Sequence, residues 1–164
     1  MDISIRPAKR SDVAVILELI RALAEYEKLS HACVATPAQL SDTLFGEHPA
    51  AEVLIAEAGA EAAGFALFFR SYSTFLAKPG LYLEDVFVYP RFRGRGVGRR
   101  LMQHLARIAV ERDLGRFEWS VLDWNAPAIA FYRSLGAVPM DGWTVQRVSG
   151  AALLRLAAEP PAEG

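Results

Sequence analysis

A glycine- and arginine-rich stretch at residues 93–98, RGRGVG, most constrains what this chain can fold into. It follows residues 81–89, a run rich in aromatic and β-branched side chains that is typical of a strand and is closed by Pro90. Apolar residues at helical spacing come after it. Glycines allow a tight turn that brings backbone N–H groups toward a ligand, and a helix N-terminus adds partial positive charge. The stretch therefore predicts a strand–loop–helix unit that suits a pyrophosphate.

The spacing of the glycines excludes two common phosphate loops. A dinucleotide-binding G-x-G-x-x-G motif counted from Gly94 requires glycine where this chain has Arg99. A Walker A loop requires Gly-Lys-Ser/Thr, which does not follow. The remaining pattern is R-x-x-G-x-G, formed by Arg93, Gly96 and Gly98. On the motif alone, a glycine turn with solvated arginines stays open as the alternative.

The charge balance argues against a nucleic-acid-binding surface. Lys and Arg number 18 and Asp and Glu 19, which gives a net charge of −1, whereas nucleic-acid-binding domains are usually basic. Five arginines nevertheless gather around the glycine loop, at positions 91, 93, 95, 99 and 100. We expect them to face the phosphates of a local anion site, with acidic residues facing a cationic ligand.

Length and composition predict one domain over residues 1–158, followed by a disordered tail at 159–164. Of the 164 residues, 52% are hydrophobic and 23% charged, which is enough to fill a core. No apolar run approaches the roughly 20 residues of a membrane span, and the N-terminus lacks a signal-peptide core. A single cysteine, Cys33, fits a reducing compartment, and the three histidines are scattered. We therefore expect a cytoplasmic protein without a metal site.

The order of predicted elements indicates a mixed α/β (α+β) fold. Strands are expected at 2–6, 52–58, 62–72, 81–89, 117–122 and 143–148, and helices at 11–27, 36–46, 97–113, 125–136 and 151–157. Ser11, Thr36 and Asn125 are the candidate N-caps. This order predicts a mostly antiparallel central sheet of 6–7 strands with helices on both faces, and parallel pairing within residues 81–122.

The R-x-x-G-x-G loop after a strand resembles the coenzyme A loop of the GCN5-related N-acetyltransferases (GNAT). The second part of the family signature is present as Asn125-Ala126-Pro127, Phe131-Tyr132 and Gly136-Ala137. Further stretches resemble the spermidine/spermine (diamine) N-acetyltransferase subfamily: residues 5–8 (IRPA), 26–27 (YE), 45–49 (FGEHP), 81–85 (LYLED) and 142–143 (GW). The resemblance runs from about residue 3 to residue 157.

The resemblance implies an enzyme with the GNAT fold that uses acetyl-CoA. Tyr132 would be the general acid, and Glu84 would hold the substrate ammonium and relay its proton. Tyr26, Glu27 and Glu84 would line the amine pocket. The residues implied in binding acetyl-CoA, through backbone groups on the strand and around the pyrophosphate, are Val86, Phe87, Val88, Arg93, Gly94, Arg95, Gly96, Val97, Gly98, Arg99, Asn125, Ala126, Pro127, Ala128 and Tyr132.

The chemistry of acetyl transfer fits these residue types. A primary ammonium with a pKa near ~10 must lose a proton before it attacks a thioester. A phenol such as Tyr132 is protonated at neutral pH and can donate to the departing sulfur, although its spacing also fits a core aromatic. Glu84 and Asp85 are adjacent, so on a regular strand they face opposite sides of the sheet. The alternation does not decide between them, and we follow the resemblance in choosing Glu84.

Two departures from the family pattern concern the substrate. Asp141 stands where the family carries glutamate, so its reach toward a distal ammonium is one methylene shorter, and the preceding loop at 138–140 is short. Trp119 brings bulk to a stretch that contacts substrate in the family, where it either narrows the pocket or packs in the core.

We therefore expect an N-acetyltransferase that acetylates a small polyamine or diamine by direct attack in a ternary complex. The alternatives are a lysine-like amino acid of the thialysine type, a protein amine, or a non-catalytic coenzyme A sensor. Exposed strand edges and the habit of the family also imply a homodimer.

Overall fold

The chain divides into two compact units, Met1–Asp123 and Trp124–Gly164. The computed structural model describes residues 2–159. The predicted tail lies outside these residues except for Glu159, and the extent of the domain stays a prediction. Each unit is described by itself below.

The first unit contains one five-stranded sheet in the order β1-β2-β3-β4-β5. Its strands are β1 (Ile3–Pro7), β2 (Glu52–Ala58), β3 (Glu61–Ser73), β4 (Lys78–Val88) and β5 (Phe117–Trp119). The first four pair antiparallel, and β5 pairs parallel to β4 with Leu81 opposite Phe117. The predicted mostly antiparallel sheet and the parallel pair are confirmed.

The expected count of 6–7 strands is wrong, because the described part of the chain forms five. Residues 143–148 form no strand, and the strand predicted at 117–122 ends at Trp119. An alternating sequence favours an extended backbone, but a strand also requires a neighbour for its N–H and C=O groups. Within the second unit, residues 124–159 contain no strand that could supply one.

The helices agree closely with the sequence prediction. They are α1 (Val13–Tyr26), α2 (Pro37–Phe45), α3 (Val97–Glu111), α4 (Ala126–Ser134) and α5 (Gly150–Ala158), with short 3₁₀ turns η1 (Arg10–Asp12), η2 (Ser30–Ala32) and η3 (Pro90–Phe92). At α2, Thr36 and Gln39 form the expected reciprocal cap, in which Gln39 N donates to Thr36 Oγ1 at 3.3 Å and Thr36 N to Gln39 Oε1 at 3.0 Å. Asn125 caps α4 by accepting from Ala128 N at 3.3 Å.

The expected cap at Ser11 is wrong, because that residue lies inside η1 and α1 begins only at Val13. The Asp12 carboxylate accepts from the backbone N–H of Lys9 at 2.7 Å and pairs with Arg6 at 2.8 Å. This network folds residues 9–12 into a turn of their own before the helix starts.

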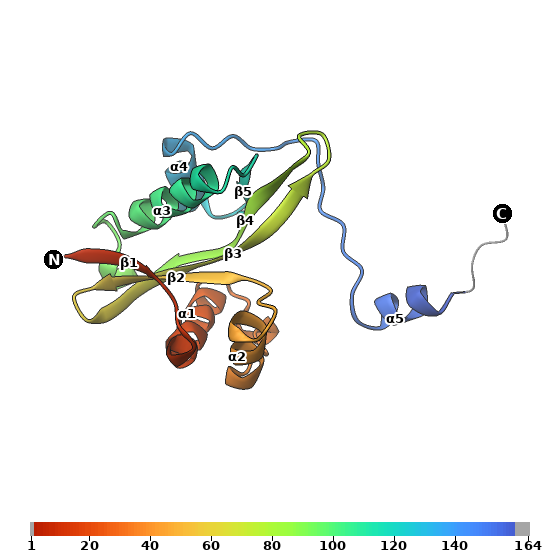
Figure 1. The fold of residues 1–164 in the computed structure, drawn as a ribbon, viewed down its shortest axis with the longest axis horizontal. Helices are drawn as coiled ribbons and strands as arrows, with labels where there is room; N and C mark the ends of the chain where they lie inside the picture. The colour runs from red at the N-terminus through yellow and green to blue at the C-terminus, as the bar shows by residue number, and fades with distance from the viewer. Residues whose placement is uncertain (1, 160–164) are drawn as a thin grey trace. The chain divides into compact units, whose positions relative to one another are not determined.

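Helices cover both faces of the sheet, as predicted. Figure 1 shows α1 and α2 on one face and α3 on the other. Ile16 and Leu19 of α1 pack with Phe65 of β3 in a core where all three are fully buried. On the opposite face, α3 buries Leu101 and Leu105.

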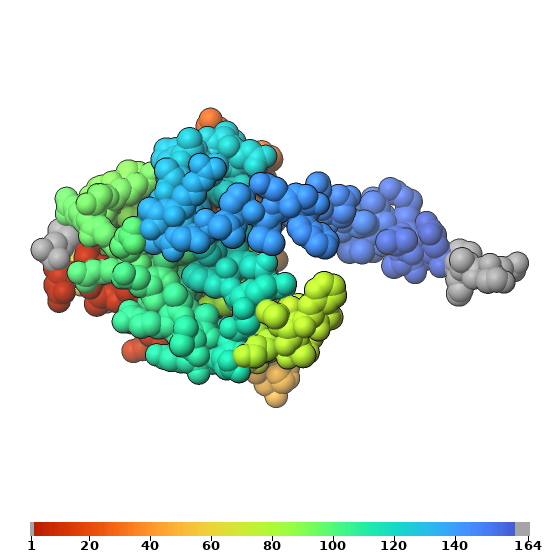
Figure 2. Space-filling view, turned by 90° about the horizontal axis from the view of Figure 1, so that it is seen from above, coloured from red at the N-terminus to blue at the C-terminus, as the bar shows by residue number. Residues whose placement is uncertain are grey.

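The start of α3 is tied to the sheet edge at β1. Arg100 Nη1 donates to the carbonyl oxygen of Ile3 at 2.8 Å. In the space-filling view, green atoms of this region accordingly lie beside the red atoms of β1 (Figure 2). Among the helices of residues 2–159, none is long and apolar enough to cross a membrane.

Candidate functional site

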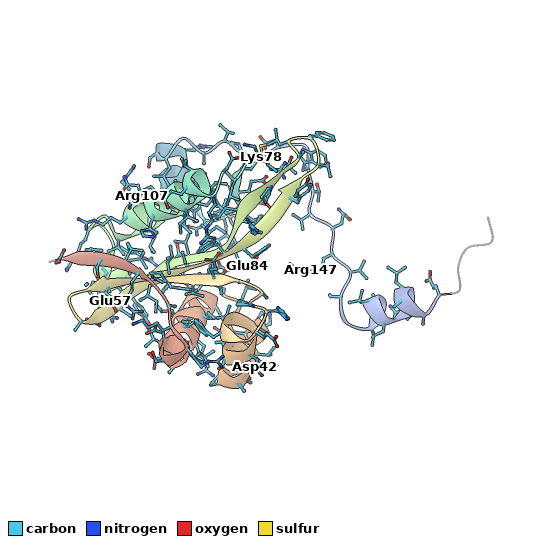
Figure 3. All side chains as sticks on the ribbon, viewed as in Figure 1. Asp42, Glu57, Lys78, Glu84, Arg107 and Arg147 are labelled. Carbon is cyan, nitrogen blue, oxygen red and sulfur yellow. The ribbon has the colours of Figure 1, made fainter. Side chains whose placement is uncertain are left out.

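A β-bulge at Glu84 shapes the middle of β4. Phe68 of β3 pairs with Leu83 and the preceding Leu67 pairs with Asp85, so that Glu84 is the extra residue (Figure 3). Because side chains alternate along β3 and Leu67 packs against the core on the α1 side, Asp85 faces α1 while Leu83 faces α3. A bulge interrupts the regular alternation at Glu84, so the alternation assumed from the sequence does not apply across Leu83–Asp85.

The bulge also marks the place where β4 loses its neighbour on one side. The parallel pairing with β5 covers Leu81–Leu83 and stops there, while β3 continues along the other edge as far as Val88. Within residues 2–159, no strand pairs with this open edge of β4 beyond the bulge.

The backbone groups at the open edge can be assigned by their alternation. Tyr89 N donates toward β3, to Ala63 O at 3.0 Å, and a Cβ on Gly64 would collide with the carbonyl oxygen of Phe87. The polar groups of Phe87 and Tyr89 thus point to β3, and those of Val86 and Val88 point to the open edge. An extended ligand can bind there by the hydrogen bonds of a further strand. The roles of Val86, Phe87 and Val88 in binding the coenzyme stay predictions; the Phe87 side chain packs in the core on the α1 side.

Three carboxylates lie near one another around the bulge. Glu84 is exposed, and Glu27 and Asp85 are half-buried. Burial raises the pKa of Asp85 from 3.8 to about 6, with further contributions from the negative charges of Glu84 and Glu27. Burial also raises the pKa of Glu27. The negative charges of Glu84 and Glu27 thus disfavour the ionised form of Asp85, so this position favours a neighbouring cation or a retained proton.

The C-terminal end of α1 brings Tyr26 and Glu27 to this cluster. The Tyr26 ring lies 6.4 Å from the ring of Phe87, which lies 5.5 Å from the ring of Tyr89. Glu27 caps α1 and its N–H donates to Leu23 O at 2.9 Å. A carboxylate at a helix C-terminus opposes the helix dipole.

The glycine loop adopts the predicted strand–loop–helix arrangement. Gly96 is the N-cap of α3, with φ of +78°, and Gly94 has φ of +74°. A Cβ at either position would meet nothing within 4 Å, so it is the backbone conformation rather than space that favours glycine. The loop leads directly into the N-terminus of a 15-residue helix, whose first N–H groups suit an anion.

The arginines around this loop do not all face an anion, which corrects the expectation for two of them. Arg91 pairs with Glu61 and lies over the rings of Tyr89 and Phe92, and Arg100 is bonded to β1. Arg93 also contacts the protein, over Tyr26 and Phe87. Arg95 and Arg99 are exposed. The loop thus uses part of its positive charge for packing.

The remaining predicted residues belong to the second unit or to β5. Asn125 is buried as the cap of α4, and the half-buried Tyr132 ring lies 5.5 Å from that of Phe131. Asp141 is exposed and precedes Gly142, whose φ is +90°. The roles of Asn125, Tyr132 and Asp141 stay predictions. Trp119 packs against Phe117, with ring centroids 4.9 Å apart.

The resemblance favours Glu84 over Asp85, whereas in the structure Asp85 faces α1 and feels the charge of Glu27. The adjacent acidic residues Glu84 and Asp85 are the sequence signal that could have indicated a role for Asp85. No residue pattern marks the bulge that turns Asp85 toward α1. Over residues 2–159, no group of three or more His, Cys, Asp or Glu side chains is arranged to hold a metal ion.

The sequence matches the acetyltransferase (GNAT) family model over residues 17–137. A thialysine N-epsilon-acetyltransferase of Mus musculus is 37% identical, over 93% of this chain and 96% of that protein. An L-ornithine N5-acetyltransferase of Arabidopsis thaliana is 34% identical, over 91% of this chain and 85% of that protein. A spermidine/spermine N(1)-acetyltransferase-like protein of Homo sapiens is 33% identical over 94% of this chain, but that match spans 24% of the human protein.

A solved structure shares the fold over nearly the whole chain. It is an integron cassette protein of V. cholerae, with a TM-score of 0.82, 26% sequence identity, and coverage of 97% of this chain and 99% of the other.

Proposed function

Since the chain belongs to the acetyltransferase (GNAT) family and is an N-acetyltransferase, we propose that it acetylates the terminal primary amine of a lysine-like amino acid. The observation that carries this proposal is the cluster of Glu27, Glu84 and Asp85 around the bulge of β4. A primary amine is a cation at neutral pH, and three converging carboxylates recognise it by charge. The mouse and Arabidopsis relatives, named for thialysine and ornithine, favour this substrate over the polyamine first expected.

The first unit fits acetyl-CoA, which GNAT acetyltransferases use as acetyl donor. The glycine loop and the N-terminus of α3 would hold the pyrophosphate, as the positive φ angles of Gly94 and Gly96 allow close approach of the backbone. The open edge at Val86 and Val88 would hold the pantetheine arm. Of the other residues predicted to bind the coenzyme, Arg95, Val97, Gly98 and Arg99 belong to the same loop and helix start.

Asp85 is the proton acceptor in this proposal, and Glu84 and Glu27 hold the charge of the amine. A carboxylate with a pKa of about 6 is ionised at neutral pH and accepts a proton from the ammonium, directly or through water. The free amine then attacks the acetyl carbonyl carbon, forming a C–N bond. A backbone N–H at Val86 or Val88 stabilises the oxygen that gains negative charge.

The attacking nitrogen loses its second proton to solvent, and collapse of this tetrahedral species breaks the C–S bond. Tyr132 is the proposed donor of a proton to the departing thiolate, and the phenolate regains a proton from solvent. The residues Asn125, Ala126, Pro127 and Ala128 at the start of α4 would border the coenzyme. Asp141 would contact the distal end of the substrate.

A polyamine or diamine is the second candidate, favoured by the excess of negative charge at the site and by the human relative. A panel of amines with acetyl-CoA, followed by release of free thiol, separates the two candidates. We expect kcat/KM for thialysine, lysine or ornithine to exceed that for spermidine by at least about tenfold. The reverse order would favour the polyamine. Turnover of a protein amine alone would contradict both candidates, and absence of any turnover would favour the sensor.

We further propose that the protein acts in the cytoplasm as a homodimer without a nucleic-acid partner. The free Cys33 suits a reducing compartment, and β1 and β5 are both edge strands. Sedimentation equilibrium tests the dimer, and a single species of 18.0 kDa would contradict it.

A further inference from the structure

Arg93 contacts three parts of the first unit. Its Nε donates to the carbonyl oxygen of Val88 at 2.8 Å, at the open edge of β4. Its guanidinium carbon lies 4.6 Å from the ring centroid of Tyr26 and 5.5 Å from that of Phe87. A cation over the face of an aromatic ring is attracted to it, and the flat guanidinium also stacks. Arg93 therefore bridges the glycine loop, the end of β4 and the end of α1.

Arg91 offers an internal comparison. It belongs to the same loop and also lies over two rings, those of Tyr89 and Phe92, at 4.6 and 4.9 Å. Its charge is paired with Glu61, at the start of β3. Arg91 thus has similar surroundings, but these contacts lie on β3, on η3 and at Tyr89, which follows β4, and not on α1.

The contacts of Arg93 reach both halves of the proposed site. The hydrogen bond from Arg93 to the Val88 carbonyl satisfies one acceptor at the open edge of β4. The Val88 N–H, which points to the same edge, does not take part in that bond. By stacking on Tyr26, it touches the residue next to Glu27, whose charge is felt at Asp85. A shift of the glycine loop is transmitted through this side chain to the acidic cluster.

We propose that Arg93 is a positioning residue that couples the coenzyme loop to the amine pocket, rather than a ligand of the phosphates. Bound coenzyme fixes the loop, the loop fixes Arg93, and Arg93 holds the end of α1 in place for the amine. Coupling between two sites is reciprocal, so coenzyme and amine each tighten the binding of the other. The amine part of this inference rests on the proposed function, while the link between the loop and α1 does not.

The experiment compares Arg93→Gln and Arg93→Lys with the matched control Arg91→Gln. Amide hydrogen exchange of residues 20–29 is measured with and without coenzyme A, which requires no turnover. The dissociation constant of coenzyme A is measured by calorimetry. The KM for the amine is measured from initial rates at saturating acetyl-CoA.

In the wild type and Arg91→Gln, coenzyme A is expected to slow exchange of residues 20–29. In both Arg93 variants this protection is lost, the dissociation constant of coenzyme A changes by less than about threefold, and KM for the amine rises about tenfold. Arg93→Lys is expected to restore neither the protection nor the KM for the amine, because lysine lacks the flat group that stacks on Tyr26 while it donates to the Val88 carbonyl.

A different pattern overturns the inference. If Arg93→Gln weakens coenzyme A binding at least tenfold and Arg93→Lys restores it, Arg93 is a phosphate ligand. If the Arg93 variants behave like Arg91→Gln in every measurement, the bridge has no role. If the wild type acetylates no amine, the proposed function fails, and the exchange experiment still decides whether Arg93 links the loop to α1.

Discussion

Replacing Asp85 by asparagine should make the protein more stable and less active, with both effects increasing as the pH rises. Asp85 is half-buried beside Glu27 and Glu84, and its pKa is raised from 3.8 to about 6. Between these two values the folded protein retains a proton that the unfolded chain releases. The contribution of Asp85 to stability is therefore fully present below pH 3.8 and is lost as the pH rises through 6.

The magnitude follows from the size of the shift. Each pKa unit corresponds to about 1.36 kcal/mol, so the ionised carboxylate lowers the free energy of unfolding by at most about 3 kcal/mol at pH 8. At pH 4 most of the penalty has disappeared, and about 0.5 kcal/mol remains. The partial exposure of Asp85 allows solvent screening, which makes the value at pH 8 an upper bound. Asparagine is of similar size and carries no charge, so Asp85→Asn removes this penalty.

Urea unfolding of the wild type and Asp85→Asn at pH 4 and pH 8 measures the effect. The variant should gain stability mainly at pH 8, while its acetyl transfer falls at least about tenfold and loses the decline in rate below pH 6 that an essential carboxylate produces. Glu84→Gln is the matched control for stability, since that neighbour is exposed. An equal difference between wild type and Asp85→Asn at both pH values would refute the argument from burial. Retention of full activity would remove Asp85 as the proton acceptor.

Three further substitutions test other parts of the structure. Tyr132→Phe should lose most of kcat and keep coenzyme A binding, which calorimetry and initial rates measure; near-full activity would exclude Tyr132 as the acid. Gly96→Ala places a side chain at φ of +78° and should destabilise the fold by about 1–2 kcal/mol and weaken coenzyme A binding, whereas an unchanged Tm would contradict the strain. Thr36→Ala removes the cap of α2 and should cost about 1 kcal/mol in urea unfolding, while Thr36→Ser, which keeps the hydroxyl, should retain most of it.

The sequence predicts the helices of this chain better than its strands. Helix caps form between residues close together in the sequence, whereas strand pairing joins residues that are far apart. The cap of Thr36 with Gln39 and the glycine before Val97 act within four residues, so they are visible in a short window. The alternation at residues 143–148 predicts an extended backbone but says nothing about a partner strand, and the second unit supplies none within its described residues. The same limit explains why the strand predicted at 117–122 ends early.

The residues of the candidate site also divide into those that a local pattern reveals and those that depend on contacts between distant segments. The glycine loop and the acidic residues Glu27 and Glu84 are recognisable as residue types at a given spacing. The inward turn of Asp85 is not, because it depends on which residues of β3 stand opposite β4. Arg93 is likewise read as a phosphate ligand from its motif, whereas its contacts with Tyr26 and Phe87 come from α1 and β4 lying next to the loop.

The bulge at Glu84 connects the two demands that the proposed acetyl transfer makes on β4. In a regular β4, Leu83 and Asp85 would face the same side of the sheet. Asp85 could then face α1 only if Leu83 left its buried position on the α3 side, where Leu83 is 1% exposed. Because Glu84 is an extra residue in β4, Leu83 stays buried on the α3 side while Asp85 faces α1. The parallel pairing with β5 ends at the same point, which frees the backbone of Val86 and Val88. In the proposed function, an amine beside Asp85 and a thioester along the open edge would therefore lie within a few residues of each other, on the two sides of this bulge. Deleting Glu84 would restore regular pairing, and we expect it to abolish acetyl transfer even if coenzyme A still binds the glycine loop.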